Sequence, residues 1–334
     1  MKERLPKLDL NVTNRCNFRC AHCAFDSGIA KMPELSLEEI ETILKDTKEL
    51  GGERFDITGG EPLLRKDIEK IISIGKSLGY KIELVTNGCL LSEEKLKRFK
   101  MLGLDGIAIS LDGSNARVYN RIRRKDKATF EIVIKNIIAA KEARFYTKVN
   151  TTVFECNIDD IPNITRLALR LGADEQGIYY FTPVGRGRRS EEQPVEPLKW
   201  LEFIRARLKS FQNCGMKISV EFPLAKKTDR ISGWGCIANN ERSHLQILPD
   251  GNVYPCAILA SYGMPIANLR RCSIKDIWDD KNLWKNYWAE ASEMFKKLSG
   301  CCVDFKSSFD IKSYDSKRYC FVCPIRKFKL ESIR

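Results

Sequence analysis

The sequence predicts an α/β fold: a partial (β/α)6, TIM-like barrel followed by a cysteine-rich α+β domain. Two observations predict the barrel. Strand-like and helix-like segments alternate through the first half and beyond, and the connections between them are short, which favours a parallel sheet with right-handed crossovers. A third observation predicts the second domain, because the alternation stops after about residue 225 and cysteines become frequent. We therefore expect domains at residues 1–215 and 216–334.

The strands are expected where short apolar, β-branched segments occur. In order, they are Lys7–Thr13, Arg54–Thr58, Lys81–Thr86, Gly106–Leu111, Lys148–Phe154 and Gly177–Phe181. Sites in such sheets lie beyond the C-terminal ends of the strands, so the residues that follow each strand carry the functional information.

A helix is expected after each strand. The helices are, in order, Ser36–Leu50, Asp67–Leu78, Ser92–Leu102, Phe130–Ala143, Asp159–Leu171 and Leu198–Phe211. Ser36 and Glu39 form the S-x-x-E pattern of a capping box at the start of the first helix. Glycines end four of the helices, as helix C-termini favour. They are Gly51, Gly79, Gly103 and Gly172.

Two further elements are expected in the second domain. His244–Cys256 resembles a hairpin whose turn is Pro249-Asp250-Gly251-Asn252. A helix is expected near Ile274–Trp288.

Composition limits the class of protein. The chain has 334 residues, of which 43% are apolar, and no apolar run approaches the ~18–20 residues of a membrane span. The start, MKERLPKLDLNV, lacks the apolar segment of a signal peptide, so we expect a cytoplasmic protein with no membrane partner. Thiols are kept reduced there, and the 13 cysteines therefore indicate metal binding or catalysis rather than disulfides. Cys89, Cys156 and Cys214 stand alone and are interpreted as inert.

The net charge is +13, with dense patches at Arg186–Arg189 and in the tail from Lys317. One interpretation is a solvated basic surface. The other is attraction to an acidic partner, such as nucleic acid, an acidic peptide or an acidic electron-donor protein.

The first strand leads into a cluster of thiols in "NRCNFRCAHCAFDS", where Cys16, Cys20 and Cys23 are spaced C-x3-C-x2-C. Three thiolates are one fewer than a [4Fe–4S] cluster normally takes, so one iron would stay open for a small molecule. Zinc is the alternative, but structural zinc takes four ligands, and His22 would have to fold back between its neighbours to serve.

Together with "TGGEP" at Thr58–Pro62, the triplet resembles the radical S-adenosylmethionine (SAM) enzymes over roughly residues 7–185. The family usually has an aromatic residue where this chain has His22. The resemblance implies a [4Fe–4S] cluster held by the triplet, with SAM chelated at its open iron. Reductive cleavage of SAM would give a 5′-deoxyadenosyl radical that abstracts a substrate hydrogen.

The resemblance also implies which residues hold SAM. Gly59 and Gly60 would allow a close backbone approach, and Glu61 would hold the methionyl ammonium. Polar residues at the strand ends suit the ribose and the carboxylate: Thr86, Asn87, Ser110, Asp112 and Asn150. The alternative is that these are ordinary turn, loop and capping residues. Arg186 either meets a carboxylate or lies on the surface.

A second cysteine group occupies the last hundred residues: Cys236, Cys256, Cys272, Cys301, Cys302, Cys320 and Cys323. "ILPDGNVYPC" and "CFVC" resemble the SPASM or twitch extension of radical SAM enzymes, which binds auxiliary [4Fe–4S] clusters. The dense C-x2-C-x5-C-x3-C run of SPASM is absent, so we expect one auxiliary [4Fe–4S] cluster. Its ligands would be Cys236, Cys256, Cys320 and Cys323, with structural zinc as the alternative.

Cys301 and Cys302 are the candidate catalytic residues, since peptide and sugar epimerases of this family use a thiol to donate hydrogen to a substrate radical. The alternative is that they are structural. We expect a flavodoxin or ferredoxin electron donor, by resemblance.

Three functions follow. The first is modification of a peptide or protein, by epimerisation or crosslinking. The second is a small-molecule reaction: a sugar epimerase or dehydrogenase, or tetrapyrrole or cofactor biosynthesis. The third is tRNA modification, which the charge permits, although no RNA-binding module is visible and nucleic acid is not the expected partner.

Overall fold

Strands and helices alternate along the chain. The strands are β1 (Lys7–Asn11), β2 (Arg54–Thr58), β3 (Lys81–Thr86), β4 (Gly106–Ser110), β5 (Tyr146–Val153), β6 (Glu175–Tyr180), β7 (Lys217–Glu221), β8 (Leu224–Lys226), β9 (His244–Ile247), β10 (Asn252–Tyr254), β11 (Ala267–Asn268), β12 (Tyr319–Phe321) and β13 (Lys327–Lys329). The α-helices are α1 (Leu37–Glu49), α2 (Ile68–Ser77), α3 (Glu93–Met101), α4 (Ala116–Arg123), α5 (Lys127–Glu142), α6 (Ile161–Arg170), α7 (Pro197–Phe203), α9 (Ala257–Ser261), α10 (Ile274–Asp279) and α11 (Lys281–Lys297).

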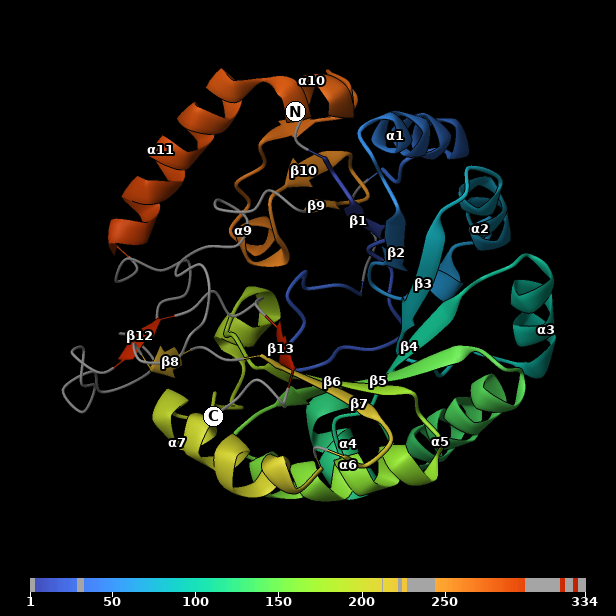
Figure 1. Cartoon of the computed structure of the whole chain (residues 1–334), viewed down its shortest axis with the longest axis vertical. Helices are drawn as coiled ribbons and strands as arrows, with labels where there is room; N and C mark the ends of the chain where they lie inside the picture. Colours follow the sequence, from blue (N-terminus) through green and yellow to red (C-terminus); the bar gives the residue numbers. More distant parts are fainter. Residues whose placement is uncertain are drawn as a thin grey trace.

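A curved, mostly parallel sheet forms the frame of the molecule, with helices along its outer side (Figure 1). The computed structural model describes residues 4–28, 33–211, 213–221, 224–226, 244–297, 319–321 and 327–329. Within these ranges the strand order is β11-β10-β9-β1-β2-β3-β4-β5-β6-β7-β13, and β8 pairs with β12 separately. Strands β1 to β7 run parallel to one another, which confirms the partial barrel, and β13 pairs with β7 in the antiparallel direction.

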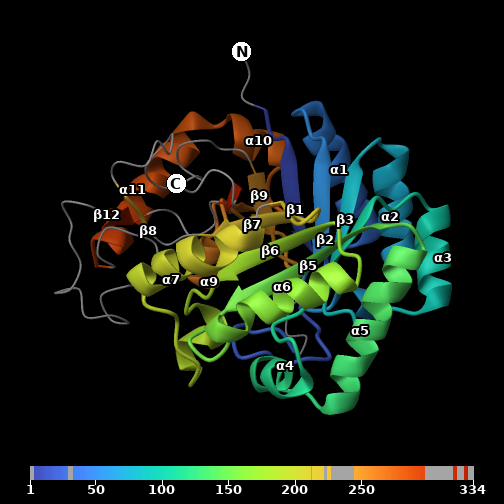
Figure 2. The ribbon, with the colours of Figure 1, turned by 60° about the horizontal axis from the view of Figure 1, so that its bottom comes forward.

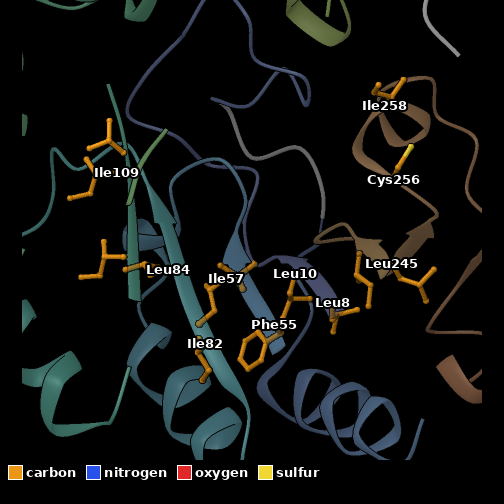
Figure 3. Packing of buried hydrophobic residues seen from close by; sticks show 14 of the residues in the cluster. Leu8, Leu10, Phe55, Ile57, Ile82, Leu84, Ile109, Leu245, Cys256 and Ile258 are labelled. Atoms are coloured by element: carbon orange, nitrogen blue, oxygen red, sulfur yellow. The ribbon is translucent and has the colours of Figure 1, made fainter. Parts of the chain in front are cut away.

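The alternation of residues along each strand separates two faces of the sheet. Phe55 of β2 and Ile82 of β3 lie under α2, where a Cβ on Gly75 would be 2.3 Å from the Phe55 ring and 2.8 Å from Ile82 Cδ1. Leu8 and Leu10 of β1 belong to the same buried cluster (Figure 3). The apolar face therefore packs against the helices, and the residues between these positions line the concave side.

The first helix begins as expected. The Ser36 side chain accepts a hydrogen bond from the Glu39 backbone, and the Glu39 carboxylate accepts one from the Ser36 backbone at 2.6 Å. Polar N-cap side chains also accept a backbone N–H at several later helices. Four of them are Ser92, Asn115, Asp126 and Ser273.

The sheet contains more strands than the six that the sequence predicts. β7 pairs in parallel with β6, and β9 pairs in parallel with β1, so both edges are extended. The predicted hairpin forms as β9 and β10. Since β9 to β11 continue the sheet of the first predicted domain, the division between residues 215 and 216 stays a prediction.

Two helical predictions are corrected. No helix was predicted between β4 and α5, but the structure has one there, α4. In Figure 2 this helix lies at the bottom of the view, below α6. The single helix near Ile274–Trp288 is wrong, because two helices, α10 and α11, meet at Asp280. The Asp280 carboxylate accepts hydrogen bonds from the Asn282 and Leu283 backbone N–H groups at 2.9 Å and so starts a new helix. None of the helices in the described ranges is long and apolar enough to cross a membrane.

Candidate functional site

The cysteine loop begins where β1 ends and is fixed there by the two glycines that follow β2. The Gly60 N–H donates to Thr13 O at 2.7 Å, and the Glu61 N–H donates to Arg15 O at 2.8 Å. A Cβ on Gly60 would lie 2.3 Å from Arg15 O, and one on Gly59, which has a φ of +141°, would lie 2.4 Å from Thr13 O. The glycines are therefore required by the approach of the cysteine loop itself.

The loop then closes on itself. Gly28 N–H donates to Asn14 O at 3.1 Å, and the Ser27 hydroxyl donates to the Asn14 side chain at 2.9 Å. Ala21 N–H donates to Ile122 O at 2.9 Å, which joins the loop to α4. The three cysteines are thus held in a short closed segment rather than on an open strand end.

Each sulfur of the triplet receives a hydrogen bond. Cys16 Sγ accepts from the Phe18 backbone N–H at 3.4 Å, and Cys23 Sγ accepts from the Ser27 backbone N–H at 3.3 Å. Cys20 Sγ accepts from the Arg123 guanidinium at 3.6 Å. Such donors stabilise negative charge on sulfur, which is the charge that metal-bound thiolates carry.

The buried surroundings of the triplet make three thiolates without a bound metal unfavourable in free energy. Burial, together with the nearby Cys20, Glu61 and Cys23, raises the pKa of Cys16 to about 12, although the hydrogen bond from the Phe18 N–H acts in the opposite direction. Burial also raises the pKa of Cys20 above its ordinary value, against the effect of Arg123. A positively charged metal centre compensates both effects, so the donor set fits an iron–sulfur cluster.

The arrangement of the side chains gives no support to a site for a single metal ion at the triplet. In the part of the chain that the structure describes, no three His, Cys, Asp or Glu side chains converge closely enough to hold one ion. A lone zinc requires that convergence, whereas a [4Fe–4S] cluster spreads its thiolates over different irons. The neighbours of the His22 ring are Phe154, at 5.5 Å between centroids, and Asp112, whose Oδ2 is 4.0 Å from Nε2; burial, with the nearby Arg123, lowers its pKa to about 4.

A buried ion pair lies behind Cys20. Arg123, the last residue of α4, has its Nε 2.5 Å from Asp112 Oδ2, and the other Asp112 oxygen accepts the Thr152 N–H at 2.7 Å. The Asp112 side chain is 0% exposed. Its predicted contact with SAM stays a prediction, and its observed partners are within the protein.

Arg186, from the segment after β6, fastens the other side of the loop. Its Nε donates to the Asp26 carboxylate at 2.8 Å, its Nη1 donates to Cys20 O at 3.1 Å, and its Nη2 donates to Ser27 O. Its own backbone N–H donates to Cys23 O at 2.9 Å. Of the two interpretations of Arg186, the structure supports the one with a carboxylate.

Glu61 ties β2 to β3. Its carboxylate accepts from the Thr86 hydroxyl at 2.7 Å and from the Asn87 N–H at 2.9 Å. Burial raises the pKa of Glu61 to about 6, although these hydrogen bonds act in the opposite direction. The Asn87 side chain donates to Asn17 Oδ1 in the cysteine loop at 2.8 Å. Glu61, Thr86 and Asn87 thus shape the edge beside the triplet, and their contacts with SAM remain predictions.

Ser110 and Asn150 lie side by side in the register of β4 and β5, and both are half-buried. The Tyr179 hydroxyl donates to Asn150 Oδ1 at 3.2 Å. Among the polar side chains of the predicted SAM-binding set, these two are half-buried, whereas those of Glu61, Thr86, Asn87 and Asp112 are buried.

The second cysteine group is only partly placed. Cys256 is buried, caps α9 and accepts the Leu259 N–H at 3.4 Å (Figure 3). The backbone of Cys320 lies in β12. Cys236, Cys301, Cys302 and Cys323 lie outside the described residues. The predicted auxiliary ligands and the predicted catalytic cysteines therefore stay predictions.

Sequence reasoning missed Asn17 and Arg123. Asn17 lies inside the triplet, where a polar side chain between ligands could have been noticed. Arg123 carried no local signal, since "RIRR" places several arginines together and only the fold shows which one is buried.

Comparisons with known proteins identify two domains in the chain. The model of the radical SAM superfamily matches residues 10–168, and the model of an iron–sulfur cluster-binding domain, SPASM, matches residues 236–324. The AdoMet-dependent heme synthase of Methanosarcina barkeri (strain Fusaro / DSM 804) is 26% identical over 342 aligned positions, covering 95% of this chain and 90% of that protein.

Two solved structures have the same fold. SuiB of Streptococcus suis, bound to its precursor peptide SuiA, superposes with a TM-score of 0.70 at 16% identity over 85% of this chain. This chain spans 66% of the SuiB chain, just under two thirds. The enzyme anSMEcpe with bound AdoMet gives a TM-score of 0.65 at 18% identity, covering 88% of this chain and 83% of that one.

Proposed function

This chain is a radical SAM protein with a SPASM domain, and from that premise we propose that it modifies a peptide or protein by abstracting a hydrogen atom. The two domains imply a SAM-binding [4Fe–4S] cluster and an auxiliary iron–sulfur cluster. When bound, the first cluster supplies the electron that cleaves SAM into methionine and a 5′-deoxyadenosyl radical.

One observation carries the proposal: three sulfurs in a single closed loop, each receiving an N–H donor, beside the glycine-rich edge after β2. Cys16, Cys20 and Cys23 would hold the cluster. The chain's own task is then to keep the loop fixed, and the hydrogen bonds of Gly60 and Arg186 to its backbone do so.

The remaining SAM contacts are proposed at the C-terminal edge of the sheet. The backbone at Gly59 and Gly60, with Glu61, Thr86 and Asn87, would form one wall. Ser110 and Asn150, with Asp112 behind them, would form the other. Ser110 and Asn150 have the exposure that contact with a ligand requires.

A peptide substrate is favoured by the likeness to SuiB, which is bound to a precursor peptide. A tetrapyrrole is the second candidate, because the heme synthase aligns with almost the whole chain. A flavodoxin or ferredoxin is proposed as the electron donor, since the basic surface would attract an acidic protein.

In the second domain, Cys236, Cys256, Cys320 and Cys323 are proposed as ligands of the auxiliary cluster. Cys302 or Cys301 is proposed as the hydrogen donor in an epimerisation. Cys302 and then Cys301 are replaced with Ala; the variant that lacks the donor should form no epimerised product while SAM cleavage continues, and normal turnover by both variants would remove this role.

The test of substrate class uses the anaerobically reconstituted full chain with SAM and dithionite in D2O. The two probes are a propionate-bearing tetrapyrrole and any short peptide that is found to be encoded beside this gene. A peptide that gains a single deuterium indicates epimerisation, and one that loses two hydrogens indicates crosslinking. Release of carbon dioxide from the tetrapyrrole, with an unchanged peptide, would replace the peptide proposal by the second candidate.

A further inference from the structure

Among the residues that the structure describes, the sulfurs of the triplet differ in the source of their hydrogen bonds. Cys16 and Cys23 accept from backbone N–H groups of their own loop, whereas Cys20 accepts from the Arg123 side chain. That side chain belongs to α4, 103 residues further along the chain. One sulfur is thus contacted by a full positive charge.

The charge of Arg123 is buried, and the carboxylate of Asp112 neutralises it. Arg123 is 7% exposed, Cys20 is 8% exposed and Asp112 is fully buried. Asp112 is itself fixed, because Thr152 N–H of β5 donates to one carboxylate oxygen and the other lies against Arg123. Burial of an ion pair costs free energy unless its geometry is well satisfied, so a pair kept in this position calls for a role.

We propose that Arg123 is a positioning residue that acts through Cys20: with Asp112 as its counter-charge, it sets the reduction potential of the iron–sulfur cluster held by the triplet. The inference rests on the proposed function, because it requires that cluster.

The physical reason is charge. A cluster gains one negative charge on reduction, and hydrogen bonds to its sulfurs, with the net charge nearby, tune the potential. Arg123 stabilises the reduced state both as a donor to Cys20 and as a positive charge in a water-poor site, where charges interact strongly. Asp112 opposes it. The two partners of the ion pair therefore shift the potential in opposite directions.

Arg121, on the same helix, gives a matched control. It lies two residues before Arg123, its side chain is 61% exposed, and it pairs with Glu192 rather than with the triplet. Arg121→Met removes the same charge from the same helix without removing a hydrogen bond to a sulfur of the triplet.

The experiment is a redox titration of the reconstituted full chain, followed by electron paramagnetic resonance. The triplet's cluster is identified as the signal that changes when SAM is added. Arg123→Met should make its reduction about tenfold less favourable, a shift of about −59 mV for one electron. Asp112→Asn should shift the potential upward, and Arg121→Met should leave it unchanged.

Shifts of Arg123→Met and Asp112→Asn in the same direction would indicate a general disturbance and would overturn the proposal, as would the absence of any shift. If Arg123→Met holds no iron, Arg123→Lys and Asp112→Asn decide. Lys keeps the charge and should leave the potential close to that of the natural chain, while Asn should raise it. A natural chain without a SAM-responsive signal would instead refute the proposed function, so the two failures are distinguishable.

Discussion

Gly60→Ala tests how the cysteine loop is held. The added methyl group would lie 2.3 Å from Arg15 O and 2.9 Å from Asn14 O, both backbone atoms that cannot rotate away. Ordinary contact requires the two chains to separate by about 1 Å. That movement weakens the bonds from Gly60 N–H to Thr13 O and from Glu61 N–H to Arg15 O, each contributing about 1 kcal/mol. With an overpacking cost of about 1–3 kcal/mol, the expected loss is about 3–5 kcal/mol.

The assay is twofold: urea unfolding of the protein, and iron per chain after anaerobic reconstitution. The Gly60→Ala variant should hold about four fewer irons per chain than the natural protein, which is the content of one cluster. The control is Gly215→Ala, because no atom lies within 4 Å of a Cβ there, although Gly215, unlike Gly60, has a positive φ of +84°. The control should cost about 1 kcal/mol and keep its iron. A Gly60→Ala variant with the stability and iron of the natural chain would refute the account of the loop.

Two further predictions concern buried charges. Burial opposes the charge of Glu175, but Lys148 and Lys217 outweigh it and lower the pKa to about 2 from the ordinary 4.5. The ionised Glu175 therefore stabilises the folded state above pH 4.5, and this contribution is lost as the pH falls toward 2. Glu175→Gln should lower the free energy of unfolding, measured with urea, by about 3 kcal/mol at pH 7. The difference between the variant and the natural chain should shrink below pH 4.5. Arg186→Met should lower the free energy of unfolding by about 3 kcal/mol, because buried carbonyl groups lose their hydrogen-bond donor. The variant should also retain less iron when a chelator is added. Arg189→Met is the control: its side chain is 72% exposed, and the change should alter the free energy of unfolding by less than about 1 kcal/mol. Equal losses for the two arginine variants, or a Glu175→Gln cost that does not vary with pH, would contradict these assignments.

Local signals account for much of the fold. The capping box at Ser36 and the glycines after the helices mark boundaries through interactions within a few residues, so the sequence alone predicts them. The pairing of β9 with β1 joins segments more than two hundred residues apart. No local pattern states that His244–Ile247 adds to the edge of the barrel, and this is why the sequence does not predict the extension of the sheet.

The same distinction applies to the site. The triplet and the glycines after β2 are local motifs, and the structure brings them into direct backbone contact. The charges around the triplet come from elsewhere: Arg123 from α4 and Arg186 from the segment after β6. Both belong to runs of arginine that look alike in sequence. Only the packing of the loop against α4 and against the segment after β6 determines which arginine is buried.

The most direct test of the central claim measures 5′-deoxyadenosine released by the anaerobically reconstituted protein with SAM and dithionite. The natural chain should bind iron and sulfide at the triplet and release 5′-deoxyadenosine. A variant with Cys16, Cys20 and Cys23 all changed to Ala should lose about four irons and release none. If the natural protein holds zinc at the triplet, or if the triple variant cleaves SAM as well as the natural chain does, the account is contradicted.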